Sequence, residues 1–145
     1  MSVARHLPGA ARVLLGLVFF VIGLNGFLQF LPQPPITGAP LAFLSALIAS
    51  GYVLPIVKGV EVIAGLMLLG NRFVPLALAL LAPIVVAILG YHLVLEPTGT
   101  PIALVVLTLE LFLAYAYRDA FAPMLKARVA PAVPEAQLRL APRPS

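Results

Sequence analysis

Two charged residues, Lys58 and Glu61, lie inside an apolar segment that continues to Leu69. The segment ends near the polar pair Asn71-Arg72, and a second apolar segment follows at once. In water, a helix that is apolar on all sides would have to be buried in a large core. In a lipid bilayer, the same pattern predicts two transmembrane helices joined by a tight turn, the first of which carries a buried charged pair.

The composition supports a membrane protein. Apolar residues make up 62% of the 145 residues and charged residues only 10%, whereas soluble domains have about 45–50% and about 25%. A soluble fold of this length could not hide so much apolar surface, so lipid must be the solvent for much of the chain. The net charge of +4 comes from basic residues beside the apolar segments, which indicates membrane topology rather than nucleic-acid binding.

The sequence predicts an all-α fold, an integral membrane four-helix bundle. A span needs about 20 residues to cross the ~30 Å hydrocarbon core, and four apolar segments approach or exceed that length, at about residues 10–31, 52–69, 73–95 and 100–117. Between the first and second spans, residues 41–51 are apolar but too few to cross, so we expect a short interfacial helix there. Residues 1–118 therefore form the membrane domain, and the basic, proline-rich residues 119–145 form a tail.

The first span follows a basic start, which is also the pattern of a cleavable signal peptide. A membrane span is favoured, because the apolar run is longer than the ~7–15 residues usual in a signal peptide and no A-x-A site follows it. Gly16 and Gly23 are seven residues apart and share one face of this span. We expect them to let a neighbouring helix approach closely, as in ordinary bundle packing.

The distribution of basic residues predicts that the N- and C-termini are both cytoplasmic. The loops at 32–51 and 96–99 contain no Lys or Arg. The N-terminal segment, the turn between the second and third spans and the tail carry eight: Arg5, Arg12, Arg72, Arg118, Lys126, Arg128, Arg139 and Arg143. Cytoplasmic loops of membrane proteins are enriched in Lys and Arg, so this asymmetry sets the orientation.

In that orientation, polar side chains gather in the outer half of the bundle. A rise of ~1.5 Å per residue places there one or more polar groups from every span: Asn25, Lys58, Glu61, His92 and Glu110. Lys58 and Glu61 are three residues apart on one helical face, which predicts an ion pair. With Glu110 the three charges sum to −1, so we expect one carboxyl group to be uncharged unless His92 is protonated or water enters the site.

Two interpretations of this cluster stay open. It is either a polar clasp that joins the helices or a site that handles a ligand or protons. A metal site is disfavoured, because two carboxylates and one distant histidine are a small ligand set with a lysine beside them. The two histidines, His6 and His92, are expected on opposite sides of the membrane, so they cannot be a haem ligand pair. The sequence shows no nucleophile–base arrangement, phosphate-binding loop or nucleic-acid-binding surface.

The segments RVLLGLVFFVIGLNGFLQFLP and SGYVLPIVKGVEVIAGLMLLGNRFVPLALALLAPIVVAILGYHL resemble the DoxX family of small four-helix membrane proteins. The resemblance extends over about Arg12–Arg118. Polar residues at defined positions make it specific, namely Gly23–Gly26, the run from Lys58 through Glu61 to Gly65, Asn71-Arg72 with Pro75, and His92. It implies a multi-pass protein of the bacterial or archaeal inner (plasma) membrane.

The resemblance also implies a functional setting. The family takes its name from a subunit linked to thiosulfate:quinone oxidoreductase and terminal quinol oxidase. This chain has no cysteine, haem ligand pair or flavin motif, so we expect no covalently bound cofactor and at most a subunit of a quinone-linked oxidoreductase rather than a self-sufficient enzyme. Its expected partners are the lipid bilayer, redox-enzyme subunits and further copies of itself.

The leading hypothesis is an accessory membrane subunit that binds a quinone or lipid in its outer half. Asn25, Lys58, Glu61, His92 and Glu110 would line the site. Lys58 and His92 would donate hydrogen bonds to a carbonyl, and a carboxylate would accept a proton. The alternatives are a small oligomeric proton-coupled transporter and a scaffold that binds no ligand.

Overall fold

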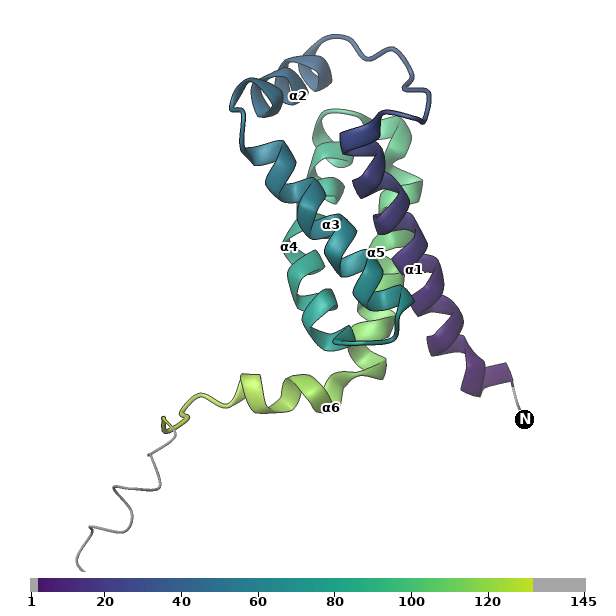
Figure 1. Ribbon diagram of the computed structural model, residues 1–145, viewed down its shortest axis with the longest axis vertical. Coiled ribbons are helices and arrows are strands. Elements are labelled where there is room, and N and C mark those ends of the chain that lie inside the picture. The colour runs from purple at the N-terminus through teal and green to yellow at the C-terminus, as the bar shows by residue number, and fades with distance from the viewer. Residues whose placement is uncertain (1–2, 132–145) are drawn as a thin grey trace, which may run out of the picture.

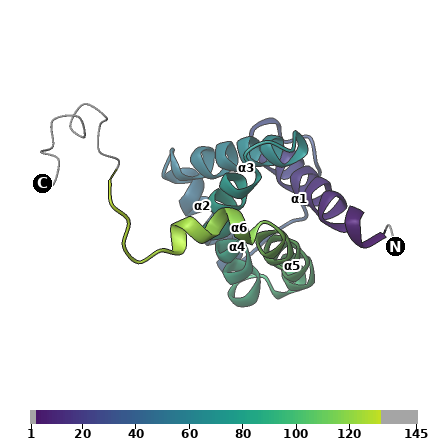
Figure 2. The same cartoon turned by 90° about the horizontal axis from the view of Figure 1, so that it is seen from below.

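The computed structural model describes residues 3–131, and every regular element in this range is helical. Four long helices form an antiparallel bundle: α1 (Val3–Leu28), α3 (Val53–Leu69), α4 (Val74–Val94) and α5 (Thr100–Ala116). Shorter elements lie at the two ends of the bundle: α2 (Ala39–Ala49), the 3₁₀ turn η1 (Pro97–Gly99), α6 (Arg118–Phe121) and the 3₁₀ turn η2 (Ala122–Leu125). Helices α1 and α4 each pack against both α3 and α5, so the helices follow one another around the bundle as α1, α3, α4 and α5 (Figures 1 and 2).

The ends of the bundle differ in charge. The start of α1, the turn after α3 and the segment that begins with α6 lie together at one end, here called the terminal end (Figure 1). Arg12, Arg72 and Arg118 belong to this end. Helix α2 and η1 lie at the opposite end, the loop end, whose loops contain no Lys or Arg. The predicted gathering of the basic segments at one end is therefore confirmed for the described residues, and the cytoplasmic position of that end stays a prediction.

Three helical segments are individually long and apolar enough to cross a membrane: His6–Leu28, Val74–Val94 and Pro97–Ala116. Helix α3 has 17 residues, which at 1.5 Å per residue is only about 26 Å. It qualifies as a span only together with α2, from which it is bent by 90°. The chain thus has three candidate spans, or four if α2 and α3 form one broken span. The sequence predicts residues 52–69 as a membrane span by themselves, whereas in the structure this segment is long enough only together with α2.

The first helix has other bounds than the predicted first span. The helix occupies Val3–Leu28 instead of residues 10–31 and continues through Pro8. It ends early because Gln29 adopts a left-handed conformation with φ 50°, and because Asn25 Oδ1 accepts a hydrogen bond from the Leu31 N–H at 2.7 Å. The Asn25 side chain thereby turns the chain out of the helix.

The other boundaries agree more closely. The short helix expected at 41–51 is α2 at Ala39–Ala49, and the helices α3, α4 and α5 begin and end within one residue of the predicted last three spans. The first residues of the predicted tail are helical, as α6 and η2. Residues 132–145 of that tail lie outside the described part of the chain.

Helices α1 and α3 approach each other along a series of glycines. A Cβ atom on Gly65 of α3 would lie 2.6 Å from the Phe20 backbone nitrogen and 2.9 Å from its Cα. A Cβ atom on Gly23 of α1 would lie 2.9 Å from the Glu61 Cβ, and one on Gly16 would lie 3.0 Å from the Leu68 Cβ. Small residues at such positions allow helix backbones to pack closely in membranes, so the expectation for Gly16 and Gly23 is confirmed.

Arg12 joins the same two helices at the terminal end. Its Nη1 atom donates to the Leu68 carbonyl and also lies 3.3 Å from the Leu69 carbonyl oxygen. The last carbonyls of a helix have no partner within the helix, and the helix dipole makes that end partly negative. The guanidinium group therefore stabilises the end of α3 and holds α1 against it.

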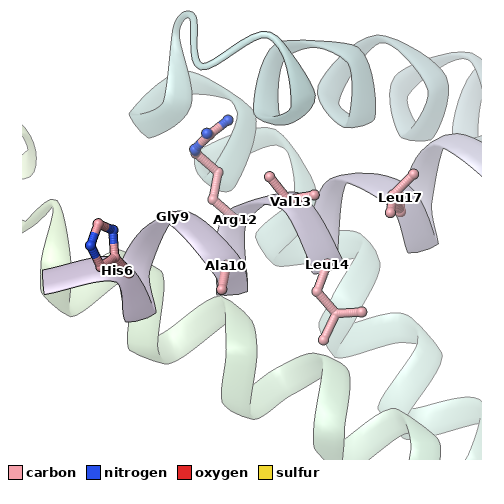
Figure 3. A pocket seen from close by; sticks show the side chains of 7 residues that line it. All are labelled: His6, Gly9, Ala10, Arg12, Val13, Leu14 and Leu17. Carbon is pink, nitrogen blue, oxygen red and sulfur yellow. The ribbon is translucent and has the colours of Figure 1, made fainter. Parts of the chain in front are cut away.

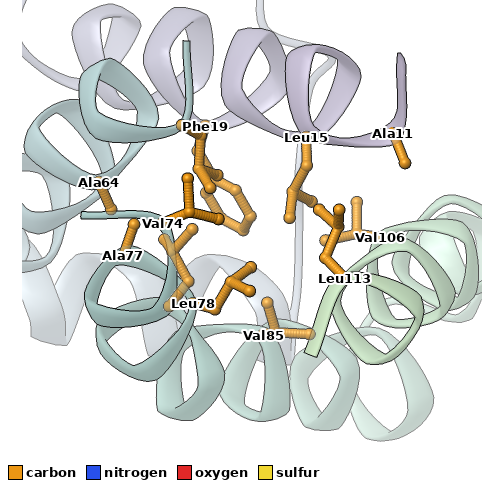
Figure 4. Packing of buried hydrophobic residues seen from close by; sticks show 12 residues of the cluster. Ala11, Leu15, Phe19, Ala64, Val74, Ala77, Leu78, Val85, Val106 and Leu113 are labelled. Atoms are coloured by element: carbon orange, nitrogen blue, oxygen red, sulfur yellow. The ribbon is translucent and has the colours of Figure 1, made fainter. Parts of the chain in front are cut away.

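The apolar core occupies mainly the half of the bundle nearer the terminal end, where side chains from all four long helices meet (Figure 4). Its fully buried leucines are Leu15, Leu68, Leu78, Leu81 and Leu113. No charged residue occurs in α3 beyond Glu61 or in α4 as far as Val85. This half of the bundle is therefore a packed apolar plug, in which Glu110, between Val106 and Leu113 of α5, is the one buried ionisable side chain of the described residues; buried Glu61 lies on the loop-end side of the plug.

Candidate ligand-binding site between the helices

A cavity of about 210 Å³ lies between the four long helices, on the loop-end side of the apolar plug. Its lining is mostly apolar, and its polar members are Lys58, Glu61 and His92. The apolar members come from α1, α4 and α5: Val18, Phe19, Ile22, Ile88, Ile102, Ala103 and Val106. Three of the five side chains predicted to form a site are thus brought together, from α3 and α4.

The cavity opens at the side of the bundle. Ile22 of α1 and Ile102 of α5 both line it, yet they are 46% and 71% exposed on the outer surface. Since these two helices are neighbours around the bundle, the opening lies between them. In a bilayer this opening would face lipid rather than water.

Lys58 and Glu61 form the predicted ion pair. Lys58 Nζ donates to Glu61 Oε2 at 2.7 Å. The Glu61 side chain is only 2% exposed, and that of Lys58 is 19% exposed. An ammonium group has three N–H donors, so after one bond to Glu61 two remain at the cavity wall. Lys58 can therefore donate to a ligand while it neutralises Glu61.

His92 has a partner that the sequence analysis missed. Its Nδ1 atom lies 2.9 Å from Glu96 Oε2 and 3.1 Å from the Glu96 carbonyl oxygen. The backbone N–H of Gly99 also donates to Glu96 Oε2, at 3.1 Å. The sequence indicates only a turn at Glu96, although the i,i+4 spacing could have predicted its contact with His92. The imidazole is thus anchored at the loop end of the cavity.

The remaining two predicted site residues, Asn25 and Glu110, do not line the cavity. Asn25 is buried and holds the end of α1 through Leu31, as described above. Glu110 is 5% exposed and lies on the same buried face of α5 as Ala103 and Val106, about one turn beyond Val106. Its Oε2 atom is buried without a hydrogen-bond partner in the described part of the chain. A buried carboxyl group therefore borders the cavity.

We expect Glu110 to be protonated in the membrane, because Lys58 is already paired with Glu61 and an isolated carboxylate in an apolar interior is very costly. Infrared spectroscopy of the reconstituted protein should show the C=O band of a protonated carboxyl group near neutral pH. Glu110→Gln should remove this band and change thermal stability little, since the neutral amide has a similar shape. A band that persists in Glu110→Gln and disappears in Glu61→Gln would assign the proton to Glu61 instead.

A second hollow of about 640 Å³ lies along α1 near the terminal end (Figure 3). Its lining comes from one helix: His6, Gly9, Ala10, Arg12, Val13, Leu14 and Leu17. Arg12 is engaged with the end of α3, and no polar groups from another helix converge there. His6 and His92 lie at opposite ends of the bundle, and within residues 3–131 no three His, Asp or Glu side chains are grouped to hold a metal ion.

The fold and the cavity define a class of protein: an all-helical protein with three or four apolar helices that can cross a membrane, which indicates an integral membrane protein. No family model, curated protein or solved structure matches the chain.

Proposed function

We propose that this protein binds the polar head group of a membrane-soluble amphiphile, a quinone or a lipid, in the cavity between its four long helices. We further propose that it acts as a DoxX-like accessory subunit of a quinone-linked redox complex in the cell inner membrane. The observation that carries the proposal is the cavity itself, which combines an ion pair and an imidazole with apolar walls and a lateral opening. Ligand sites typically have such mostly apolar walls with a few placed polar groups.

The size of the cavity favours a ring-shaped head group. An apolar protein cavity of about 150 Å³ accommodates benzene, whereas pockets for whole drug-sized ligands are about 300–1,000 Å³. At about 210 Å³, the cavity suits one substituted ring. A long apolar tail would remain outside and pass between Ile22 and Ile102 into the lipid. A quinone consists of one substituted ring and a long apolar tail, so it fits this cavity better than a bulky phospholipid head group.

The orientation follows from the basic residues. If the terminal end is cytoplasmic, as the positive-inside rule predicts, the cavity opens toward the outer leaflet. Helix α2 then lies at the outer interface, which suits its composition, since it has no buried residue and exposes Leu41, Phe43 and Ile48. An amphiphile diffusing in the outer leaflet would reach the cavity without crossing the membrane.

The apolar plug argues for binding rather than transport. Between the cavity and the terminal end, leucines from all four long helices fill most of the described interior, and Glu110 is the one buried ionisable side chain among them. One buried carboxyl group is not a chain of polar groups, so a proton or polar substrate would find no continuous polar path through the described part of one copy of this bundle. Because the chain has no cysteine, thiol-based electron transfer would also fall to a partner subunit.

The proposal is tested with a fluorescent reporter at the cavity mouth. The chain has no tryptophan, so Ile102→Trp provides a single tryptophan, which can be excited selectively, at an exposed lining position. In proteoliposomes, decylubiquinone should quench it in a saturable manner, because the quinone ring binds beside it. Ala103→Leu, placed in the same background, should abolish saturation, since the larger side chain fills the cavity while staying apolar.

Leu104→Trp is the matched control. It lies in α5 at nearly the same depth, is 47% exposed and is not part of the cavity lining. Quinone dissolved in the lipid should quench this reporter only in proportion to its concentration. Equal, non-saturable quenching of both reporters would refute quinone binding. The same titration with a phospholipid carrying a quenching label on its head group separates a lipid site from a quinone site.

A further inference from the structure

We infer that Glu96 fixes the tautomer of His92 so that the cavity prefers a head group with a hydrogen-bond-donating hydroxyl, the hydroquinone form over the quinone. This inference rests on the proposed function for the identity of the ligand. The tautomer of His92 does not depend on the identity of the ligand and can be measured in the protein alone.

The hydrogen on Nδ1 is assigned by its neighbours. Two oxygens of Glu96, the carbonyl at 3.1 Å and Oε2 at 2.9 Å, converge on this one nitrogen. A carbonyl oxygen can only accept, and an ionised carboxylate is likewise an acceptor. Oε2 also accepts the Gly99 N–H, which favours the ionised form. Nδ1 must therefore carry the hydrogen and donate it to Glu96.

The remaining ring nitrogen is then an acceptor. A neutral imidazole has one N–H and one lone pair, so with Nδ1 protonated the lone pair is on Nε2. In residues 3–131, Nε2 has no hydrogen-bond partner of its own. From the sequence, His92 is predicted to donate a hydrogen bond to a carbonyl. The observed pairing with Glu96 reverses this role for the neutral side chain.

The loop that holds Glu96 also restrains the ring. A Cβ atom on Gly99 would collide with Cε1 and Nδ1 of His92, so the backbone of η1 packs directly against the imidazole. Thr100 Oγ1 donates to the His92 carbonyl at 3.2 Å, which joins the start of α5 to the end of α4. The hydrogen bond that one ring nitrogen of a histidine makes commonly sets whether the other nitrogen is available to a ligand. Glu96 is thus a positioning residue for His92.

The two polar walls of the cavity are complementary to a hydroquinone. Lys58 offers N–H donors, and the neutral His92 offers the Nε2 acceptor. A quinone has only carbonyl acceptors, so one could bond to Lys58 while Nε2 would remain unpaired. A hydroquinone accepts from Lys58 through one oxygen and donates to His92 through its hydroxyl. A bound ring would cover Nε2, and leaving a covered acceptor unpaired is costly, so we expect a preference of about tenfold for the reduced form.

The preference is measured with the Ile102→Trp reporter under anaerobic conditions, at mildly alkaline pH. Decylubiquinone and its hydroquinone are titrated separately, and the expected ratio of dissociation constants is about ten in favour of the hydroquinone. Glu96→Gln should lower the ratio without abolishing it, because the amide can donate to Nδ1 while the backbone carbonyl of residue 96 still accepts from it. Asp119→Asn, which removes a carboxylate from the exposed α6, should keep the ratio unchanged.

The outcomes separate the two proposals. If neither form binds, quinone binding is refuted and the preference with it; if the labelled phospholipid does not bind either, the proposed function fails. If both forms bind equally or the quinone binds more tightly, the function stands and the preference inferred here is wrong. If the ratio is unchanged in Glu96→Gln, the role assigned to the Glu96 carboxylate is wrong.

The tautomer itself has a direct, ligand-free test. The chain has two histidines, His6 and His92, so ¹⁵N-histidine labelling gives two imidazole systems, and His6→Gln assigns them. At the same pH, His92 should show a protonated Nδ1 and an unprotonated Nε2. Glu96→Gln should shift or mix these signals. A protonated Nε2 in the wild-type protein would overturn the inference even if a quinone binds.

Discussion

Gly65→Ala is expected to destabilise the bundle by about 1–3 kcal/mol, the range usual for overpacking a well-packed core. The new Cβ atom would lie 2.6 Å from the Phe20 backbone nitrogen and 2.9 Å from its Cα. These atoms belong to the backbone of α1, so no side-chain rotation can relieve the contact. Helices α1 and α3 must separate, which also weakens the contacts at Gly23 and the bond from Arg12 to the end of α3.

Gly59→Ala is the matched control, because it lies in the same helix and a Cβ atom there would meet nothing within 4 Å. It should leave stability unchanged or raise it slightly, since alanine favours a helix more than glycine does. The measurement is unfolding in mixed detergent–SDS micelles followed by circular dichroism. If the two alanine variants were equally stable, the close approach of α1 and α3 at Gly65 would be contradicted.

Lys58→Met is expected to cost about 3–5 kcal/mol, the range found when one partner of a buried ion pair is removed. Glu61 is only 2% exposed and Lys58 is its salt-bridge partner at 2.7 Å. Without the lysine, the carboxylate must remain charged in an apolar interior or take up a proton. The double variant Lys58→Met/Glu61→Leu should recover most of the loss, because two apolar side chains leave no charge to neutralise.

A double-mutant cycle on these two residues, using the same SDS unfolding assay, gives their coupling energy. The cycle also decides between the two interpretations of the polar cluster. A double variant that is as stable as wild type but no longer binds the quinone identifies a ligand site. A double variant that stays unstable and a wild type that binds nothing would identify a clasp between helices. A near-neutral Lys58→Met would show that Glu61 needs no positive partner.

Much of the architecture could be predicted because it depends on local patterns. The apolar segments have a length that only helices in lipid explain, and the last three helices begin and end within one residue of the prediction. The Lys58–Glu61 pair follows from i,i+3 spacing within one helix, so no tertiary information was needed to foresee it. The basic residues predicted which ends of the helices lie together, because in an antiparallel bundle every second connection lies at the same end.

The composition of the site was less predictable, because it depends on how each helix is rotated. Glu110 was expected in the site by depth alone, yet its side chain borders the cavity without lining it. Asn25 lies at a suitable depth, but its amide oxygen is used by the Leu31 N–H. Glu96 is beyond the end of α4, and it becomes important only because the turn after that helix brings its carboxylate back to His92.

By itself, therefore, the sequence determined that the chain folds into apolar helices suited to a membrane, that their polar groups favour one half and that one ion pair forms within α3. Hydropathy and helical spacing are properties of single segments, which is why they suffice for these features. Only the tertiary structure decided which side chains share a cavity, where it opens and which nitrogen of His92 is free. These features depend on the distances and rotations between helices, set by contacts such as Gly65 with Phe20 that join residues far apart in the chain.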